Sequence, residues 1–246
     1  IPKMFFNPKF KNYRISNFNQ KIEILKSYNI DFIINKKFDK KFSKTKYKNF
    51  IKNVLYKKIK PRYIFVSDNF RFGNKREGDV SSLKQFEKVY GYKIINPSPL
   101  KKNLKIVSST LIRKYLSEGK IKVANKYLDR NWSIEGLVKT GRRMGRQIGF
   151  PTCNIDIVDY IISKPGVYSV KVKIGKNNKK YNGIANIGYR PTFNQKKLLL
   201  EVNIFNFSKN IYNKKLTVEF ISFIRGEKKF KSIDQLKKQI DKDILV

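Results

Sequence analysis

The sequence predicts an α/β domain followed by an antiparallel β-barrel or sandwich that closes with a helix. Between residues 20 and 66, amphipathic segments alternate with short apolar runs, which is typical of parallel α/β architecture. After about residue 130 the pattern changes to short alternating strands separated by turn residues, which indicates an antiparallel sheet. With 246 residues, of which 40% are apolar, the chain is long enough to form two modest cores.

Helical and strand-like segments follow one another through the first half. Helical patterns occur in QKIEILKSYN (20–29), KYKNFIKNVLYKKI (46–59) and SSLKQFEKVYG (81–91), whereas DFIIN (31–35), RYIFVS (62–67) and YKIINPSPL (92–100) are expected as strands. Two more helices, VSSTLIRKYLSEGK (107–120) and IKVANKYLDR (121–130), are separated at Gly119. The loop NFRFGNKREGD (69–79) follows a strand, which is where α/β sheets tend to bind ligands.

The second half contains the strands of the predicted barrel. They are WSIEGLVKT (132–140), GVYSVKVKIG (166–175), YNGIANIG (181–188), LLLEVNIFNF (198–207) and LTVEFISFI (216–224). Ser232 and Gln235 then match a capping box, which predicts the start of the final helix. The apolar stripe of this helix consists of Ile233, Leu236, Ile240 and Ile244.

The composition restricts the class of function. A net charge of +38 suggests nucleic-acid binding, but 45 lysines and 11 arginines are spread along the whole chain instead of gathering with aromatic residues. We therefore interpret most of the charge as a solvated surface and expect no specific nucleic-acid partner. The alternative is a basic RNA-binding or ribosome-associated protein, and the sequence leaves the oligomeric state undetermined.

Other classes of site are excluded by residues that the sequence lacks. It has no histidine, so a histidine-based metal site is impossible, and the single cysteine, Cys153, cannot form an internal disulfide. No apolar run is long enough to span a membrane, and no signal-type start is present. These observations favour a cytoplasmic protein without a membrane partner.

The segment GRRMGRQIGFPTCNI (141–155) is the first candidate site. Thr152 and Asn154 are two residues apart on a predicted strand, so they share one face and offer oxygens suited to Mg²⁺ or phosphate. The glycines that would let the backbone approach a polyphosphate are Gly141, Gly145 and Gly149, and the positive charges are Arg142, Arg143 and Arg146. Cys153 is expected on the opposite, apolar face. The alternative is a basic hairpin loop leading into a strand with a polar edge.

LLLEVNIFNF carries the second candidate. Leu198, Leu200, Val202 and Ile204 form its apolar face, so Glu201 lies on the other face. A carboxylate in such a strand could act as a general base near a substrate hydroxyl, or it could be an exposed residue paired with a lysine. Two later segments add further polar candidates, namely Arg190 and Thr192 in NIGYRPTF and Arg225 and Glu227 in FIRGEKKF.

The third candidate is VSSTLIR (107–113). Ser108, Ser109 and Thr110 lie at a predicted helix N-terminus, and Arg113 follows on the same helix face as Ser109. Free N–H groups, the helix dipole and a guanidinium favour an anion such as phosphate there. The alternative is an ordinary serine-capped helix with a surface arginine.

Taken together, these segments resemble the bacterial bifunctional riboflavin kinase/FMN adenylyltransferase family, also called FAD synthetase. The resemblance runs through nearly the whole chain in family order. It is carried by EILKSYNIDFII, DNFRFGNKREGD, VSSTLIRKYLSEGKIKVANKYLDR, GRRMGRQIGFPTCNI, GVYSV, NIGYRPTF, LEVNIF and IRGEKKF.

The resemblance implies a Rossmann-like nucleotidyltransferase domain over residues 1–128 and a riboflavin kinase barrel with a C-terminal helix over residues 129–246. It implies that Thr152 and Asn154 hold Mg²⁺ and the ATP phosphates, and that Glu201 takes the proton from the ribityl 5′-hydroxyl of riboflavin. ATP would also contact Gly141, Arg146 and Gly149 in the barrel, and Ser108, Ser109, Thr110 and Arg113 during adenylylation of FMN to FAD. The flavin-binding candidates are Asn69, Phe70, Arg71, Phe72, Arg190, Thr192, Arg225 and Glu227.

Several positions depart from the family pattern. Ser67 and Asn69 stand where the family usually has Gly and Asp, and Asn203 stands where a His commonly follows the catalytic Glu. The N-terminal signature G-x-F-D-x-x-H-x-G-H does not occur, and FFNPKF (5–10) is similar to a segment that normally follows it. We therefore expect the first domain to be N-terminally incomplete, and the 246-residue chain to form little FAD.

Overall fold

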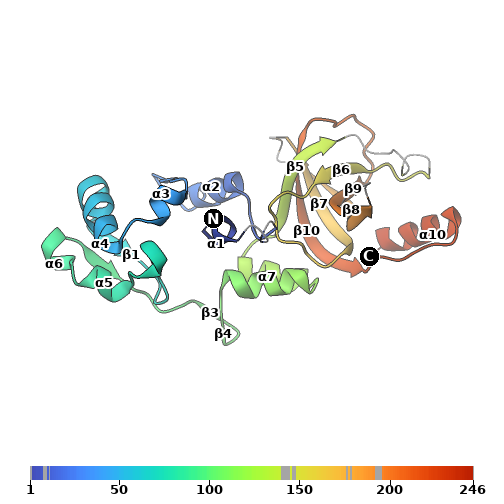
Figure 1. The fold of residues 1–246 in the computed structure, drawn as a ribbon. Coiled ribbons are helices and arrows are strands. Elements are labelled where there is room, and N and C mark those ends of the chain that lie inside the picture. The colour runs from blue at the N-terminus through green and yellow to red at the C-terminus, as the bar shows by residue number, and fades with distance from the viewer. Residues whose placement is uncertain are drawn as a thin grey trace. The chain divides into compact units, whose positions relative to one another are not determined.

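The computed structural model describes residues 2–7, 10, 12–139, 145, 148–175, 177, 179–191 and 196–245. It divides into two compact units, shown in Figure 1. The first unit consists of Ile1–Phe10 and Ile34–Val107, and the second of Lys11–Ile33 and Ser108–Val246. In the described part of the chain, no helix is both long enough and apolar enough to span a membrane.

The first unit contains short helices around a small parallel sheet. Strands β1 (Tyr63–Phe65) and β2 (Lys93–Ile95) pair in parallel, with Ile64 opposite Ile94. The helices are α1 (Pro2–Phe6), α3 (Lys40–Ser43), α4 (Tyr47–Phe50), α5 (Val80–Lys84) and α6 (Glu87–Tyr90), with the π-helix η1 (Ile51–Ile59) and the 3₁₀ turn η2 (Asn74–Arg76). A hairpin of β3 (Lys101–Lys102) and β4 (Lys105–Ile106) completes the unit.

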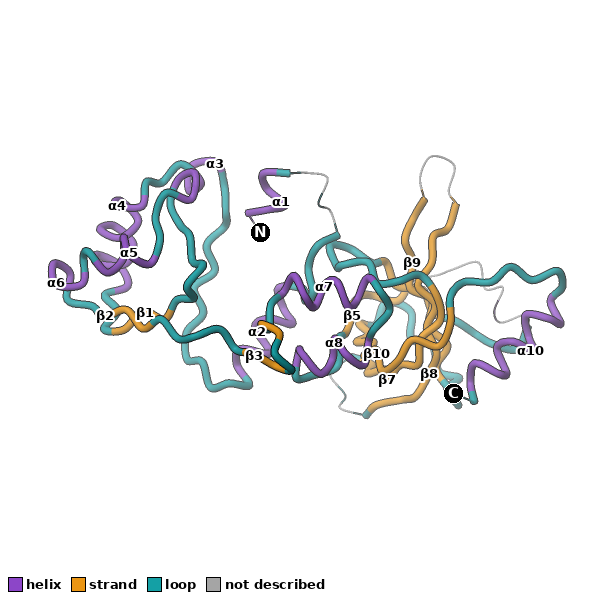
Figure 2. The backbone as a smooth tube through the Cα atoms, turned by 90° about the horizontal axis from the view of Figure 1, so that it is seen from below, coloured by secondary structure: helices purple, strands orange, loops and turns teal. Residues whose placement is uncertain are grey.

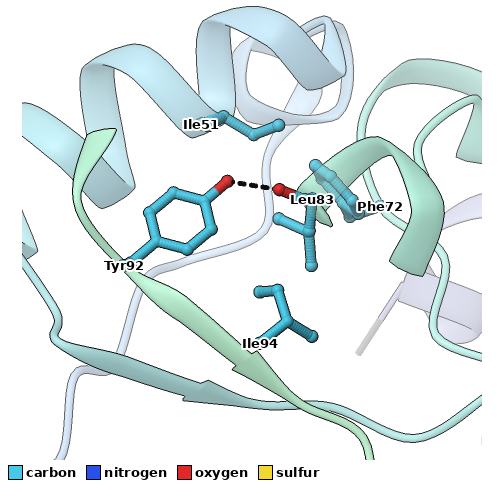
Figure 3. Close-up of a cluster of buried hydrophobic side chains, with 5 residues drawn as sticks. All are labelled: Ile51, Phe72, Leu83, Tyr92 and Ile94. Carbon is cyan, nitrogen blue, oxygen red and sulfur yellow. Dashed lines mark hydrogen bonds between the residues drawn. The ribbon is translucent and has the colours of Figure 1, made fainter. Parts of the chain in front are cut away.

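The core of this unit forms where the helices meet the parallel sheet. Its buried side chains are Ile51, Phe72, Leu83, Tyr92 and Ile94, drawn in Figure 3. The phenol of Tyr92 donates a hydrogen bond of 2.7 Å to the carbonyl of Leu83, so its polar end is satisfied inside the core (Figure 3). The predicted helices at 46–59 and 81–91 both supply core residues, which explains their apolar periodicity.

The prediction of a strand at DFIIN (31–35) was wrong. Residues 30–39 form neither helix nor strand, and the side chains of Phe32 and Ile34 are 89% and 74% exposed. A β-strand needs a neighbour to accept and donate its backbone hydrogen bonds. Within the described residues, the sheet that contains β1 has β2 as its second strand, and the segment pairs with neither of them.

The second unit is built around a closed six-stranded barrel. Its strands are β5 (Ser133–Lys139), β6 (Cys153–Asp156), β7 (Gly166–Ile174), β8 (Lys180–Pro191), β9 (Lys196–Ile204) and β10 (Lys215–Arg225), in the spatial order β10-β5-β6-β9-β8-β7. Every pair is antiparallel. The prediction of an antiparallel barrel is thus confirmed, and the predicted strands all lie in it.

Helices of the described residues accompany the barrel in this unit. They are α2 (Phe18–Lys26), α7 (Ser109–Ser117), α8 (Ile121–Leu128) and α10 (Ile233–Ile244), and Figure 2 shows α7 and α8 beside the orange strands. Helices α7 and α8 are separated at Gly119, whose φ of 75° lies in the left-handed region that favours glycine. Helix α10 begins at its N-cap Ser232, as predicted, and lies alongside the barrel (Figure 1).

The barrel core extends into the segment that precedes α2. Trp132 is fully buried against Phe220, with ring centroids 4.6 Å apart, and its indole donates to the carbonyl of Ile15 at 2.9 Å. Asn17 and Gln20 both hydrogen bond to the phenol of Tyr160, at 2.7 and 2.9 Å. The barrel unit therefore includes residues from both halves of the sequence.

Candidate functional site

Three polar side chains lie next to one another across neighbouring barrel strands. Asn154 of β6 is directly opposite Glu201 of β9, and Glu201 is directly opposite Asn186 of β8. Directly opposite residues of antiparallel strands project to the same face of the sheet. Asn154, Glu201 and Asn186 therefore form a polar row on one face of the sheet. For Asn154 and Glu201 this agrees with the polar strand faces that the sequence predicts.

The polar row forms one wall of a pocket of about 480 Å³, which we call the α10 pocket. Thr152 and Asn203 extend this wall, while Arg225, Glu227 and Phe230 line the pocket after β10. The opposite wall comes from α10, whose residues Ile233, Leu236 and Ile240 also line the pocket. The pocket thus places polar oxygens and the carboxylate of Glu201 opposite an apolar surface, and the carboxylates of Glu227 and Asp243 also line it.

The apolar stripe of α10 faces this pocket, and its side chains are not closed off in a dry core. Ile233 remains 60% exposed, and Leu236, Ile240 and Ile244 are half-buried. An apolar helix face normally gains stability by burial. A flat apolar ligand in the pocket would complete that burial.

Asn154 carries a carboxamide oxygen with an unmet hydrogen-bonding capacity. The residue is only 6% exposed, and its Oδ1 atom accepts no hydrogen bond from the described residues. A buried polar atom without a partner is costly and usually indicates a missing ligand, ion or water. The carboxamide oxygen therefore fits as one ligand of a hard cation such as Mg²⁺, which uses few protein oxygens and is held largely by waters and substrate phosphates.

A carboxylate-rich metal centre is absent from the part of the chain that the structure describes. No group of three or more Cys, Asp or Glu side chains there could hold a metal ion. A cation in the α10 pocket would depend on Asn154, Thr152 and the phosphates of a bound nucleotide, in keeping with Mg²⁺ sites that use few protein ligands.

Asn203 holds the segment that precedes Asn154. It is 8% exposed, and its Nδ2 atom donates to the carbonyl of Pro151 at 2.7 Å. Pro151 immediately precedes Thr152, so this bond fixes the entry of the chain into β6. Asn203, which stands where the family commonly has a His, therefore contacts the backbone just before β6.

A second pocket of about 410 Å³ lies on the other side of Thr152, and we call it the loop pocket. Cys153, Val202 and Ile204 line one side, and the segment Phe207–Tyr212 lines the other. Thr152 lines both pockets. Nothing in the sequence marks residues 208–212 as part of a site, because Ser208, Lys209 and Asn210 are typical of an ordinary turn.

Cys153 lies away from the polar row, as predicted. It is 8% exposed, its thiol donates to the carbonyl of Val202 at 3.4 Å, and it lines the loop pocket. Burial raises the pKa of this thiol to about 11. Cys153 is therefore a neutral packing residue at neutral pH.

Glu227 approaches the barrel where a glycine makes room for it. A Cβ atom at Gly188 would lie 2.3 Å from Oε1 of Glu227 and 3.3 Å from Nδ2 of Asn186. Any side chain at Gly188 would therefore displace the carboxylate from the edge of the α10 pocket. The absence of a side chain at Gly188 of the NIGYRPTF segment therefore leaves room for the Glu227 carboxylate.

The glycine loop before β6 is only partly described. Gly149 has a φ of 86°, which favours glycine, and a Cβ at Gly145 would lie 2.4 Å from the carbonyl oxygen of Phe150. Gly141, Arg142, Arg143, Arg146 and Thr192 lie outside the described residues, as does the side chain of Arg190. Their predicted contacts with ATP and flavin stay predictions.

The VSSTLIR segment forms the start of α7. Ser108 is its N-cap, accepting from the amide of Leu111 at 3.2 Å, and Ser109 and Thr110 occupy the first turn. Arg113 donates from Nε to the carbonyl of Tyr13 at 2.9 Å and lies 3.7 Å over the ring of that tyrosine. Burial lowers the pKa of Arg113. The segment thus has a structural role, and its phosphate role stays a prediction.

The flavin candidates of the first unit have different surroundings. Phe72 is a buried core residue (Figure 3), and its ring stacks on Phe70 with centroids 5.5 Å apart. Asn69 and Arg71 are exposed, and Nη1 of Arg71 donates to the carbonyl of Phe70 at 3.0 Å. Phe72 therefore contributes to folding, whereas the polar pair is available to solvent.

Comparisons with known proteins agree with this geometry. The riboflavin kinase family model matches residues 128–246, and the FAD synthetase family model matches residues 1–111. A bifunctional riboflavin kinase/FMN adenylyltransferase of Buchnera aphidicola subsp. Schizaphis graminum is 43% identical over 99% of this chain and 78% of its own length. The protein of that name from Haemophilus influenzae is 37% identical over 99% of this chain and 79% of its own length.

A solved structure is also similar over most of the chain. A protein from Streptococcus pneumoniae, described as a macrolide-efflux protein, matches 94% of this chain and 74% of its own chain with a TM-score of 0.83 and 29% identity.

The chain belongs to the bifunctional riboflavin kinase/FMN adenylyltransferase family. Its fold is confirmed as an FAD synthetase nucleotidyltransferase domain followed by a riboflavin kinase barrel with a C-terminal helix. Riboflavin, FMN, FAD and ATP are the substrates and products of these enzyme families. The comparisons give no support to the RNA-binding alternative.

Proposed function

We propose that the barrel phosphorylates riboflavin with ATP to give FMN, and that the complete protein also adenylylates FMN to FAD. The observation that carries the kinase proposal is the row of Asn154, Glu201 and Asn186 inside a pocket with an apolar opposite wall. Riboflavin has the matching chemistry, with a flat apolar ring system at one end and a polar ribityl chain at the other.

The two pockets divide the substrates between them. The flavin ring lies in the α10 pocket against Leu236 and Ile240, and its ribityl chain points toward Glu201. The nucleotide lies in the loop pocket, so its terminal phosphate reaches Thr152, the residue common to both pockets. This assignment brings the 5′-hydroxyl and the γ-phosphate together beside Glu201.

Glu201 is the general base. Its carboxylate takes the proton of the ribityl 5′-hydroxyl as that oxygen forms a bond to the γ-phosphorus, and the bond from this phosphorus to the β–γ bridging oxygen breaks to release ADP. The products are FMN, ADP and the proton held by Glu201, which later passes to solvent. Phosphoryl transfer depends mainly on positioning and charge neutralisation, so one well-placed carboxylate suffices.

Thr152 and Asn154 would hold Mg²⁺, which would neutralise phosphate charge when bound. The glycine loop residues Gly141, Arg146 and Gly149 would contact the same nucleotide. For adenylylation of FMN, we assign Ser108, Ser109, Thr110 and Arg113 to the ATP phosphates, and Asn69, Phe70 and Arg71 to the flavin. We place the boundary between the nucleotidyltransferase and kinase domains at residue 128, while the compact barrel unit also contains residues 11–33 and 108–128. We propose small molecules as the partners and the cytoplasm as the location.

The kinase proposal is tested by incubating the 246-residue chain with riboflavin, ATP and MgCl₂ and separating the flavins by chromatography. FMN and ADP should form in equal amounts, and omission of ATP or MgCl₂ should abolish both. Failure of the folded chain to form FMN under these conditions would refute the assignment.

A further inference from the structure

A buried ion pair between Arg225 and Asp243, which both line the α10 pocket, fastens α10 to the barrel. Arg225, at the end of β10, donates from Nε to both carboxylate oxygens of Asp243 at 2.9 and 3.0 Å, and from Nη2 to Oδ2 at 2.7 Å. The two side chains are only 14% and 2% exposed. Because the guanidinium and the carboxylate meet at two points, the contact fixes orientation as well as distance.

Neighbouring groups complete this cluster. Gln239, one turn before Asp243, donates from Nε2 to Oδ1 of the same carboxylate at 2.9 Å. Arg225 also donates from Nη1 to the carbonyl of Gly226 at 3.0 Å, and its guanidinium lies 5.7 Å from the ring centroid of Phe230. The donors of Arg225 are therefore directed largely at groups of the protein itself.

The position of Asp243 would be unfavourable without its partner. It lies in the last turn of α10, where the helix dipole disfavours negative charge, and it is buried. The guanidinium of Arg225 offsets both effects. A buried ion pair of this kind adds little net stability compared with apolar packing, but it can select one geometry among several.

Helix α10 needs such a constraint because its apolar face lies over a pocket. Leu236 and Ile240 line a volume of about 480 Å³ and are only half-buried, so part of their apolar surface faces the pocket and is not packed against the barrel. The Arg225–Asp243 pair, in contrast, gives the helix a fixed attachment near its C-terminal end.

We propose that Asp243 is a positioning residue for the phosphorylation of riboflavin. Acting through Arg225, it sets the place of α10 and thereby the width of the slot that receives the flavin ring. The inference rests on the proposed function, in which this slot binds riboflavin, and it makes Arg225 a clamp for the helix instead of a direct ligand of the flavin.

The test compares Asp243→Asn with Asp241→Asn, a matched control that removes the same charge from an exposed position of the same helix. Asp243→Asn should raise the KM for riboflavin about tenfold, the effect of one lost charge-assisted hydrogen bond. The KM for ATP should change less than about twofold, because neither Asp243 nor Arg225 lines the loop pocket. Asp241→Asn should change neither constant.

Two measurements separate this proposal from the proposed function. Hydrogen exchange of the amides in 233–244 should be faster in Asp243→Asn than in Asp241→Asn, whether or not the protein forms FMN. Riboflavin fluorescence titration gives the dissociation constant without turnover, and it should rise in parallel with the KM. If wild-type protein binds riboflavin but forms no FMN, the kinase assignment fails while the clamp remains testable.

A double variant, Arg225→Met with Asp243→Leu, addresses the role of the pair in stability. Apolar replacement of a buried ion pair is often neutral for folding, so the thermal unfolding midpoint of the double variant should lie near that of the wild type. Riboflavin affinity should stay low, because apolar packing lacks the directional contact. Recovery of affinity together with the midpoint would overturn the proposal. So would an Asp243→Asn variant with wild-type affinity beside an Arg225→Met variant with weakened affinity.

Discussion

Asn154 and Glu201 lie directly opposite each other in the pairing of β6 and β9, although 46 residues separate them along the chain. The carboxamide oxygen of Asn154 accepts no hydrogen bond from the described residues, and the carboxylate of Glu201 lines the same pocket. In the proposed mechanism, this pairing would place the Mg²⁺ ligand Asn154 next to the general base Glu201.

Replacement of Glu201 by glutamine should separate binding from turnover. Glu201→Gln keeps the shape of the side chain but removes the proton acceptor, so turnover should fall about 100-fold or more while riboflavin affinity changes little. FMN formation and riboflavin fluorescence titration measure the two quantities. The control is Glu23→Gln, which changes an exposed glutamate of α2. Near-normal turnover of Glu201→Gln would show that another group is the base.

Replacement of the proposed Mg²⁺ ligands should weaken nucleotide binding. Asn154→Leu and Thr152→Val each exchange an oxygen for an apolar group of similar size, so the affinities for ATP and Mg²⁺ should fall together. Calorimetric titration of ATP with and without MgCl₂ measures the effect. If both variants lose the fold while the remaining folded fraction binds ATP normally, the two side chains only complete a strand edge.

Replacing each of two buried asparagines on this face by leucine should change the free energy of unfolding by different amounts. The amide of Asn203 donates to Pro151 at 2.7 Å, whereas Oδ1 of Asn154 accepts no hydrogen bond from the described part of the chain. Asn203→Leu leaves the Pro151 carbonyl without a donor and should cost about 1–3 kcal/mol. Asn154→Leu removes a polar atom that has no partner there and should cost less than about 0.5 kcal/mol or stabilise the fold.

Urea unfolding of the two variants provides the comparison, and the two substitutions are chemically identical. Equal losses of unfolding free energy would mean that Oδ1 of Asn154 is satisfied in solution by a tightly held group.

The alternation of the strands was sufficient to predict an antiparallel barrel or sandwich, because local alternation reports the exposed and buried faces. The family resemblance selected the barrel. The alternation also placed Glu201 and Asn154 each on its polar face. It could not show that these two residues are opposite each other, because register depends on which strands pair across a long stretch of chain. The strand predicted at 31–35 failed for the same reason, since an apolar run says nothing about whether a partner strand is present.

Two parts of the site left weak signals in the sequence. The sequence places Asp243 on the polar face of an amphipathic helix, which predicts an exposed side chain. In the structure Asp243 is buried and paired with Arg225. The wall of the loop pocket, Phe207–Tyr212, matches no motif of the sequence, so its part in a pocket follows from the fold.

The stability of the barrel should depend on pH through Glu219 of β10. This residue is 9% exposed and lies 2.8 Å from Nζ of Lys180 and 3.6 Å from Nζ of Lys173, and Asn131 donates to it at 3.4 Å. Burial alone would raise the pKa of its carboxyl, but the hydrogen bonds from Lys180 and Asn131 and the two lysine charges outweigh burial and hold the pKa below its usual value of 4.5.

A carboxyl with a lowered pKa in the folded state binds fewer protons there than in the unfolded state, so its contribution to stability is present above pH 4.5 and is lost as the pH falls through the folded pKa. The free energy of unfolding of the wild type should therefore decline on acidification below that pH. The free energy of unfolding of Glu219→Gln should decline less steeply. At pH 7 this variant should be less stable than the wild type, because Lys180 loses its charged partner. Urea unfolding at several pH values between 7 and 3 measures both slopes, with Glu23→Gln as the control for the loss of one exposed carboxylate. Parallel curves for wild type and Glu219→Gln would show that the ionisation of Glu219 does not contribute to the acid sensitivity of the fold.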